Sequence, residues 1–202
     1  MNELLPTDGH DYDIIEKAVL QIKDTRGMTC EIGVRRGGGS RTIIDCLIAN
    51  NDLNRHHICI DPYGNIDYMA GDFVTKYDYD NSMRNDCLMN IYQYTHGLPV
   101  HLHFFVLEDT EFFNRYYDGV PVYDEYKQLL TKYALVHLDG PHDFRSVLNE
   151  FNFFKTRCEQ GAVIIFDDIG FWAHDRDLEP IVLANGFRLF EKNNTKAAYI
   201  KT

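Results

Sequence analysis

Apolar and polar residues follow one another in segments whose lengths fit an α/β protein. Short runs rich in Val and Ile have the composition of parallel strands that are buried on both faces. They predict strands at 28–33, 56–61, 100–107, 134–138 and 162–167. Helical spacing in the intervening segments predicts helices at 12–25, 40–50, 83–95, near 123–132, 142–158 and 176–184. Ser40 is placed to cap the second of these helices.

Two further strands are expected near the end of the chain. The segment GFRLFEKNNTKAAYIKT contains two strand-like runs joined at Asn193-Asn194, a dipeptide that tolerates the positive φ of a hairpin turn. Residues 62–82 are rich in Tyr, Asp, Asn and Gly and show no period, so we expect an insertion or mobile flap on the substrate side. The whole pattern predicts one domain, 1–202, with a doubly wound α/β fold and a C-terminal antiparallel hairpin.

Charge and composition limit the partners of this domain. The 202 residues carry a net charge of −11 and no basic cluster longer than Arg35-Arg36, which argues against nucleic acid and against an anionic membrane surface. No apolar run approaches a membrane span, and the N-terminal residues lack an apolar signal core. Five scattered cysteines without a CxxC pair fit reduced thiols. We therefore expect a cytoplasmic protein that acts on a small molecule.

Carboxylates follow three of the predicted strands, at Asp61, at Asp139 and at the pair Asp167-Asp168. The carboxyl ends of parallel strands share one edge of the sheet, where ligands bind. Two carboxylates about 5 Å apart repel by roughly 3 kcal/mol at an effective dielectric of about 20, so the last three acids must be protonated or bind a cation. Oxygen ligands favour Mg²⁺, Ca²⁺ or Mn²⁺ over zinc. The alternative is structural: one acid caps a helix and another pairs with Arg145 or Arg176.

A glycine-rich turn lies between the first strand and the next helix. It reads E-x-G-x-x-x-G-G-G-S and matches neither the dinucleotide fingerprint nor the phosphate-binding loop. This favours a nucleoside ligand without a pyrophosphate. Asp61, 22 residues after Gly39, is placed to accept hydrogen bonds from a ribose. A purely structural turn with a surface Asp is the alternative.

Four motifs in register resemble class I S-adenosylmethionine-dependent methyltransferases, most closely the small metal-dependent O-methyltransferases of the macrocin type. They are EIGVRRGGGS (31–40), IDPYG (60–64), LDGPH (138–142) and GAVIIFDD (161–168). The resemblance implies a Rossmann-like, mostly parallel seven-stranded sheet. Arg35 and Pro141 depart from the family pattern.

The resemblance also implies roles for individual residues. S-adenosylmethionine would be bound by Glu31, Gly33, Gly37, Ser40, Asp61, Asp109 and Asp139. A divalent metal, expected to be Mg²⁺, would be held by Asp139, Asp167 and Asp168 and would lower the pKa of an acceptor hydroxyl. Asp139 would thus take part in catalysis, with His142 or His174 as the general base.

Three functions stay open at this point. The leading one is methyl transfer to a hydroxyl of a small molecule such as a sugar or phenol. A nicotinamide-dependent oxidoreductase is disfavoured by the glycine spacing, and a non-catalytic nucleoside-binding domain would gain nothing from clustered acids. The oligomeric state stays open as well, with a homo-oligomer as one option.

Overall fold

The computed structural model describes residues 9–70, 73–76, 79–123 and 126–202. The elements follow one another in the order α1 (Asp13–Gln21), β1 (Met28–Ile32), α2 (Gly38–Ala49), β2 (His56–Ile60), β3 (Asp67–Ala70), β4 (Phe73–Lys76), α3 (Asn81–Thr95), β5 (His101–Phe105), α4 (Asp109–Arg115), β6 (Val120–Tyr123), β7 (Lys127–Leu130), β8 (Tyr133–Leu138), α5 (Phe144–Phe154), β9 (Cys158–Phe166), α6 (His174–Asp177), α7 (Glu179–Ala184), β10 (Phe187–Lys192) and β11 (Ala197–Lys201).

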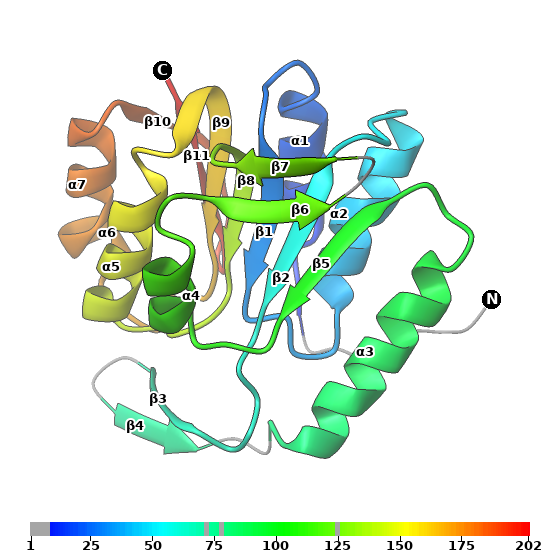
Figure 1. The fold of residues 1–202 in the computed structure, drawn as a ribbon. Helices are drawn as coiled ribbons and strands as arrows, with labels where there is room; N and C mark the ends of the chain where they lie inside the picture. Colours follow the sequence, from blue (N-terminus) through cyan, green and yellow to red (C-terminus); the bar gives the residue numbers. More distant parts are fainter. Residues whose placement is uncertain (1–8, 71–72, 77–78, 124–125) are drawn as a thin grey trace.

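Seven strands form one sheet in the order β10-β11-β9-β8-β1-β2-β5 (Figure 1). The strands β9, β8, β1, β2 and β5 are parallel to one another. At the other edge, β11 is antiparallel to β9, and β10 is antiparallel to β11. All residues of β1, β2 and β8 are buried, because helices cover both faces of the sheet. The predicted fold class, with its terminal hairpin, is confirmed.

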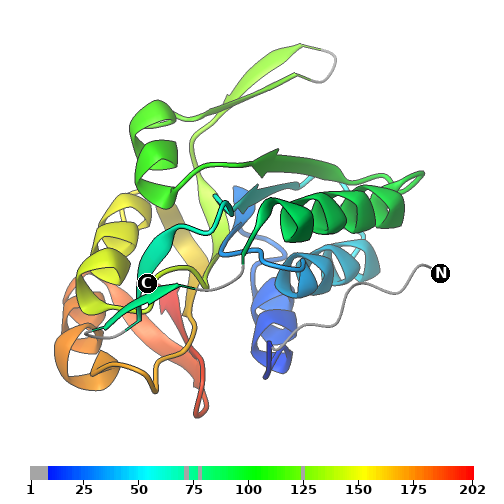
Figure 2. The ribbon, with the colours of Figure 1, turned by 90° about the horizontal axis from the view of Figure 1, so that it is seen from below.

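Helices α1, α2 and α3 lie on one face of the sheet, and α4, α5, α6 and α7 lie on the other (Figure 2). Alternation along the strands divides the core accordingly. In β9, for example, Val163 and Ile165 pack with α1 and α2, while Ile164 and Phe166 pack in the larger core on the α5 side. None of the described helices is long and apolar enough to cross a membrane.

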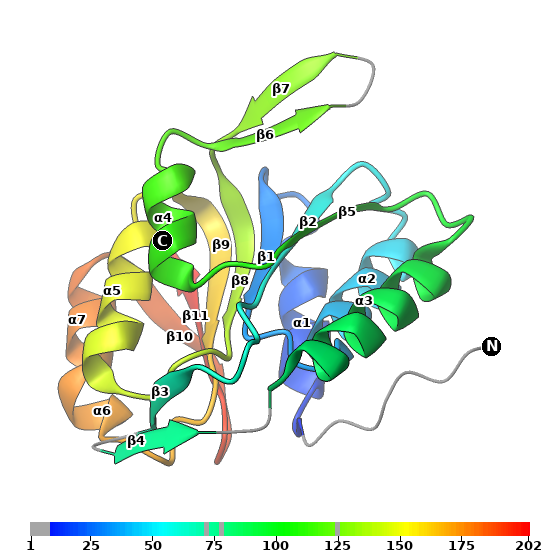
Figure 3. The same cartoon turned by 60° about the horizontal axis from the view of Figure 1, so that its bottom comes forward.

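The predicted helix near 123–132 is wrong. Residues 120–123 and 127–130 instead form the β6–β7 hairpin, which extends away from the body (Figure 3). The alternately buried Val120 and Val122 anchor β6 in the core, and this period-2 burial overrides the helical propensity of the following residues. A helix, α4, forms instead in the polar stretch before it, where Phe112 and Phe113 are buried.

The predicted flap contains a short hairpin, β3–β4, at the edge of the sheet where the parallel strands end (Figure 3). Strands of four residues are too short to give a readable period, which explains why the sequence shows none. Phe73 and Val74 of β4 are exposed. Residues 71–72 and 77–78 of the predicted flap lie outside the described part of the chain. The expected closure over substrate stays a prediction.

Candidate functional site

The carboxyl ends of four parallel strands meet at one edge of the sheet. Backbone hydrogen bonds join them in a row: Gly33 N–H donates to Ile60 O (3.0 Å), Asp139 N–H to Ile32 O (2.9 Å) and Asp167 N–H to Leu138 O (3.0 Å). The residues after β1, β2, β8 and β9 are therefore neighbours, as the sequence predicted. This brings the glycine turn and the acids together at one edge of the sheet, which we call the crevice because ligands are expected to bind there.

The glycine turn requires glycine at two positions. Gly33 has φ +81°, and a Cβ there would lie 1.9 Å from the Asp139 carbonyl oxygen, so β1 and β8 end closer together than any side chain permits. Gly37 has φ +86° and precedes α2, where a Cβ would lie 2.8 Å from Ile91. The unpaired N–H groups of the first turn of α2 therefore stand beside the crevice, which suits a negatively charged ligand group.

Asp61 joins the end of β2 to the glycine turn. Its carboxylate accepts backbone N–H groups from Arg35 (2.8 Å) and from Tyr63 (3.0 Å). Burial raises the pKa of Asp61 to about 6, against the lowering effect of these hydrogen bonds. The side chain is 6% exposed. Each oxygen of a carboxylate can accept more than one hydrogen bond, so a ribose hydroxyl still has an acceptor here.

Glu31 and Ser40 lie beneath the turn rather than at its surface. Both are buried, and the Ser40 hydroxyl donates to the Glu31 carboxylate. The other Glu31 oxygen lies 3.0 Å from Nδ1 of His137. The expected contact of these two side chains with the cofactor is untested, and in this arrangement they support the turn from below.

His137 extends this contact to a second acid and a lysine. Its Nε2 lies 3.4 Å from Asp167, whose carboxylate also forms a buried ion pair with Lys196. Burial opposes protonation of His137, but hydrogen bonds to Asp167 and Glu31 outweigh it and raise its pKa to about 9. Burial likewise opposes ionisation of Asp167, yet His137 and Lys196 hold its pKa below the usual value. We call Glu31, His137, Asp167 and Lys196 the inner network.

A second group faces the crevice. Oxygen atoms of Asp139 and Asp168 and a ring nitrogen of His142 all lie within 4.8 Å of one another. His142 Nε2 is 3.3 Å from Asp168 and 4.0 Å from Asp139. Burial, together with the charge of Asp167, raises the pKa of Asp139 well above its usual value. Burial also raises the pKa of Asp168 and lowers that of His142. We call Asp139, His142 and Asp168 the crevice cluster.

Adjacent residues thus enter different groups, because β9 ends at Phe166. Asp167 continues the strand direction and points to the inner network. Asp168 has φ +49°, and its N–H donates to the Asp167 side chain at 2.7 Å, so the chain turns and presents Asp168 to His142. The metal set expected from the sequence was Asp139, Asp167 and Asp168; the structure puts His142 beside Asp139 and Asp168, and pairs Asp167 with Lys196. The alternative of a paired acid holds for Asp167, although its partner is neither Arg145 nor Arg176.

Two other predicted site residues lie farther from this cluster. Asp109 begins α4 directly after β5, and burial raises its pKa. His174 is buried among Phe166, Trp172 and Tyr199, with Nδ1 3.0 Å from Asp175. It is in neither group, whereas His142 lies beside Asp139 and Asp168.

Three residues of this region were not predicted from the sequence. His137 lies inside the predicted strand 134–138 and was not singled out, although Glu31 pairs with it in register. Lys196 precedes Ala197, which pairs with Phe166, so the register of the hairpin on β9 would have placed it beside Asp167. Glu150 of α5 is fully buried, and neither carboxylate oxygen has a hydrogen-bond partner among the described residues. No sequence signal marks it.

The same elements recur in proteins of known structure. The O-methyltransferase NovP has a TM-score of 0.67 at 17% identity, covering 95% of this chain and 79% of that one. The calicheamicin methyltransferase CalS11 has a TM-score of 0.61 at 14% identity, covering 94% and 78%. An O-methyltransferase from Bacillus cereus, in complex with SAH, has a TM-score of 0.56 at 12% identity, covering 98% and 84%. At these identities, the structural similarity shows that the fold is shared. A search of curated proteins gave no match.

The family is established by the sequence itself. A family model described as a methyltransferase domain matches residues 30–169, which is well over half of the chain and includes every strand end that borders the crevice. The nicotinamide-dependent alternative is thereby set aside. The chain belongs to this methyltransferase family and is an S-adenosylmethionine-dependent methyltransferase with a class I fold.

Proposed function

We propose that this enzyme transfers the methyl group of S-adenosylmethionine to a hydroxyl of a small molecule, assisted by a divalent cation. The observation that carries the proposal is the crevice cluster: two carboxylates and an imidazole converge beside the glycine turn. Burial, with a smaller contribution from the charge of Asp167, raises the pKa values of Asp139 and Asp168, and a bound cation would favour their ionised forms. Asp167 could join this role only by giving up its ion pair with Lys196.

The donor set fits a hard or borderline cation. Asp139 and Asp168 supply oxygen, which suits Mg²⁺ and Mn²⁺, and His142 adds a nitrogen that favours Mn²⁺ of the two. A bound cation would act as a Lewis acid toward the acceptor oxygen. The lowered pKa of His142 leaves its imidazole neutral near pH 7, which is the form that can bind a cation.

The acceptor is proposed to be a hydroxylated molecule such as a sugar or a phenol. CalS11 is described as a TDP-rhamnose 3'-O-methyltransferase, and this chain shares its fold. The net charge of −11 favours a small acceptor over nucleic acid. Cofactor binding is assigned to the glycine turn, with Gly33 and Gly37, and to Asp61, Asp109 and Asp139.

The test combines binding and turnover. Calorimetry with S-adenosylhomocysteine should show binding in chelator, because the glycine turn and Asp61 do not depend on the cluster. Methyl transfer from labelled S-adenosylmethionine to a panel of sugars and phenols should then be abolished by chelator and restored by Mn²⁺ or Mg²⁺. Full activity in chelator would refute the metal role, and transfer to amines or carbon acids alone would refute the hydroxyl acceptor.

A further inference from the structure

Three histidines lie together at the other end of the sheet, where the parallel strands begin. His56 is the first residue of β2, and its register partner in β5 is His101. His103 follows two residues later in β5, so its side chain leaves the same face as that of His101. Adjacent strands therefore bring three imidazoles to one patch of the sheet. Along β2, this patch is about 15 Å from Asp61 and the crevice.

The ring of His56 contacts the rings of both His101 and His103. His56 Nδ1 and His103 Nε2 are 2.8 Å apart, and their rings are stacked with centroids 5.1 Å apart. The His101 ring centroid is 4.5 Å from that of His56. His56 is 8% exposed, whereas His101 and His103 are half-buried. The sheet thus fixes the three backbone positions and leaves the group accessible from one side, but as the rings stand their nitrogens do not all lie within 4.8 Å of one another.

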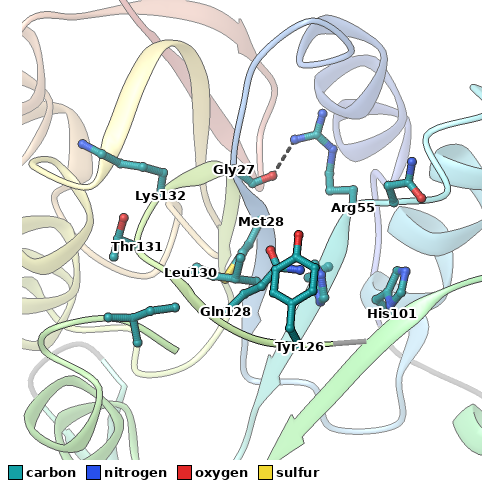
Figure 4. A pocket seen from close by; sticks show the side chains of 12 residues that line it. Gly27, Met28, Arg55, His101, Tyr126, Gln128, Leu130, Thr131 and Lys132 are labelled. Carbon is teal, nitrogen blue, oxygen red and sulfur yellow. Dashed lines mark hydrogen bonds between the residues drawn. The ribbon is translucent and has the colours of Figure 1, made fainter. Parts of the chain in front are cut away.

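A cavity of about 640 Å³ supplies that access. It lies between the β6–β7 hairpin and the amino ends of β1, β2 and β5, and its lining includes His56, His101, Tyr126 and Gln128. Figure 4 shows His101 at the wall of this cavity, with Tyr126 and Gln128 of the hairpin segment next to it. Ligands can therefore reach the histidines without passing through the crevice.

We infer that His56, His101 and His103 form a second, separate site that binds a divalent transition metal, with Zn²⁺ as the expected ion. Three imidazoles without a carboxylate select Zn²⁺, Cu²⁺ or Ni²⁺ and disfavour Mg²⁺. Nitrogen ligands of tetrahedral Zn²⁺ lie about 3.3 Å from one another, given bonds of about 2.0–2.1 Å. His56 and His103 are slightly closer than this, so both rings must turn apart to share an ion. The fourth position faces the cavity, where water or an external ligand completes the coordination.

Two positively charged side chains near the cavity would repel a metal ion, but each lies beside a carboxylate. Arg55 also lines it, but its guanidinium is paired with Asp52 at 2.5 Å and donates to the carbonyls of Thr25 and Gly27, the latter contact being drawn in Figure 4. Lys132 lies 3.9 Å from Glu159. A bound ion would in turn join β5, the edge strand, to β2, and should raise the melting temperature.

The experiment uses the full chain with the crevice cluster silenced by Asp139→Asn and Asp168→Asn. Zn²⁺ calorimetry on this double variant should give one equivalent of bound metal, and Zn²⁺ should raise its melting temperature. Adding His103→Gln should weaken binding about tenfold or more, since even outer-shell partners of a metal change affinity by 10–100-fold. His101→Gln should do the same, and His96→Gln, an exposed histidine of a loop, should change nothing.

Circular dichroism of each metal-free variant identifies any loss of folding, and His101→Gln stands in where His103→Gln is unstable. Cu²⁺ bound to the double variant should show nitrogen hyperfine structure in its electron paramagnetic resonance spectrum. The inference is overturned when the double variant binds no Zn²⁺, or when both histidine variants bind it as tightly as their parent. Neither result bears on the metal proposed for the crevice.

Discussion

The inner network and the crevice cluster each join two carboxylates to a histidine, but they differ in how their charges are balanced. In the inner network, Asp167 has Lys196 and His137 as partners, and the Lys196 side chain is 1% exposed. In the crevice cluster, Asp139 and Asp168 share one His142, and the Asp168 side chain is 36% exposed. The inner network, whose negative charges have positive partners, holds the ends of the strands together. The crevice cluster has fewer positive partners for its carboxylates, which leaves them available to a ligand. Adjacent acids in one motif thus have different electrostatic surroundings, one suited to stability and the other to the proposed cation.

The largest effect is expected from breaking the inner network. Lys196→Met should lower the free energy of unfolding by about 3–5 kcal/mol, because it leaves Asp167 buried with only a histidine. Urea denaturation measures this. Lys192→Met is the matched control on the same hairpin, since Lys192 pairs with the exposed Asp175 and such pairs contribute little. Equal stability of the two variants would show that the inner network is not structural.

Breaking the crevice cluster should affect turnover rather than stability. Asp168→Asn should reduce turnover about 100-fold or more, which is about 2.7 kcal/mol, and leave S-adenosylhomocysteine binding unchanged. Asn tolerates the positive φ at this position, so the backbone should persist. Asp167→Asn, which removes a charge from the inner network, should lower the free energy of unfolding, as Lys196→Met does. A stable Asp167→Asn together with an unstable Asp168→Asn would reverse the assignment of the two groups.

Asp61 belongs to neither group, since backbone N–H donors hold it, and it tests whether the cofactor site is separate from both. Asp61→Ala should weaken S-adenosylhomocysteine binding by about 1.5–3 kcal/mol, the range for hydrogen bonds to a charged group. Because Arg35 and Tyr63 also lose an acceptor, Asp61→Asn serves as the control that keeps one oxygen. Unchanged affinity in both variants, measured by calorimetry, would mean that the ribose binds elsewhere.

Glu150 differs from the acids of both groups, because its buried carboxylate has no hydrogen-bond partner among the described residues. Burial, with the charges of Asp109 and Asp143, raises its pKa well above the usual value. Such a group is protonated in the folded protein over a wider range than in the unfolded chain, so stability falls as pH rises above about 4.5. Glu150→Gln should therefore raise the free energy of unfolding by about 1–3 kcal/mol at pH 8 and change it little at pH 4. A variant destabilised equally at both pH values would indicate that the carboxylate has a partner.

The sequence predicted the strands and the edge of the sheet where they deliver their acids, because burial on both faces leaves continuous apolar runs. It failed where tertiary contacts decide. The β6–β7 hairpin forms through the burial of Val120 and Val122, which no local pattern distinguishes from a helix start. Likewise, the separation of Asp167 from Asp168 depends on Lys196, whose place beside β9 follows only from a long-range strand register. His142 was one of two candidate bases from the sequence, but its position between two carboxylates required the fold.

The Lys196–Asp167 ion pair also has a consequence for the order in which the enzyme matures. Lys196 follows β1, β2, β8 and β9 along the chain, so a ribosome completes every acidic strand end before it makes their lysine. Until Lys196 is made, the buried Asp167 at the end of β9 has only His137 as a partner. Insertion of β11 beside β9 supplies the missing charge and completes the sheet at the same moment. Catalytic competence should therefore appear late and abruptly during synthesis, as a single event rather than strand by strand.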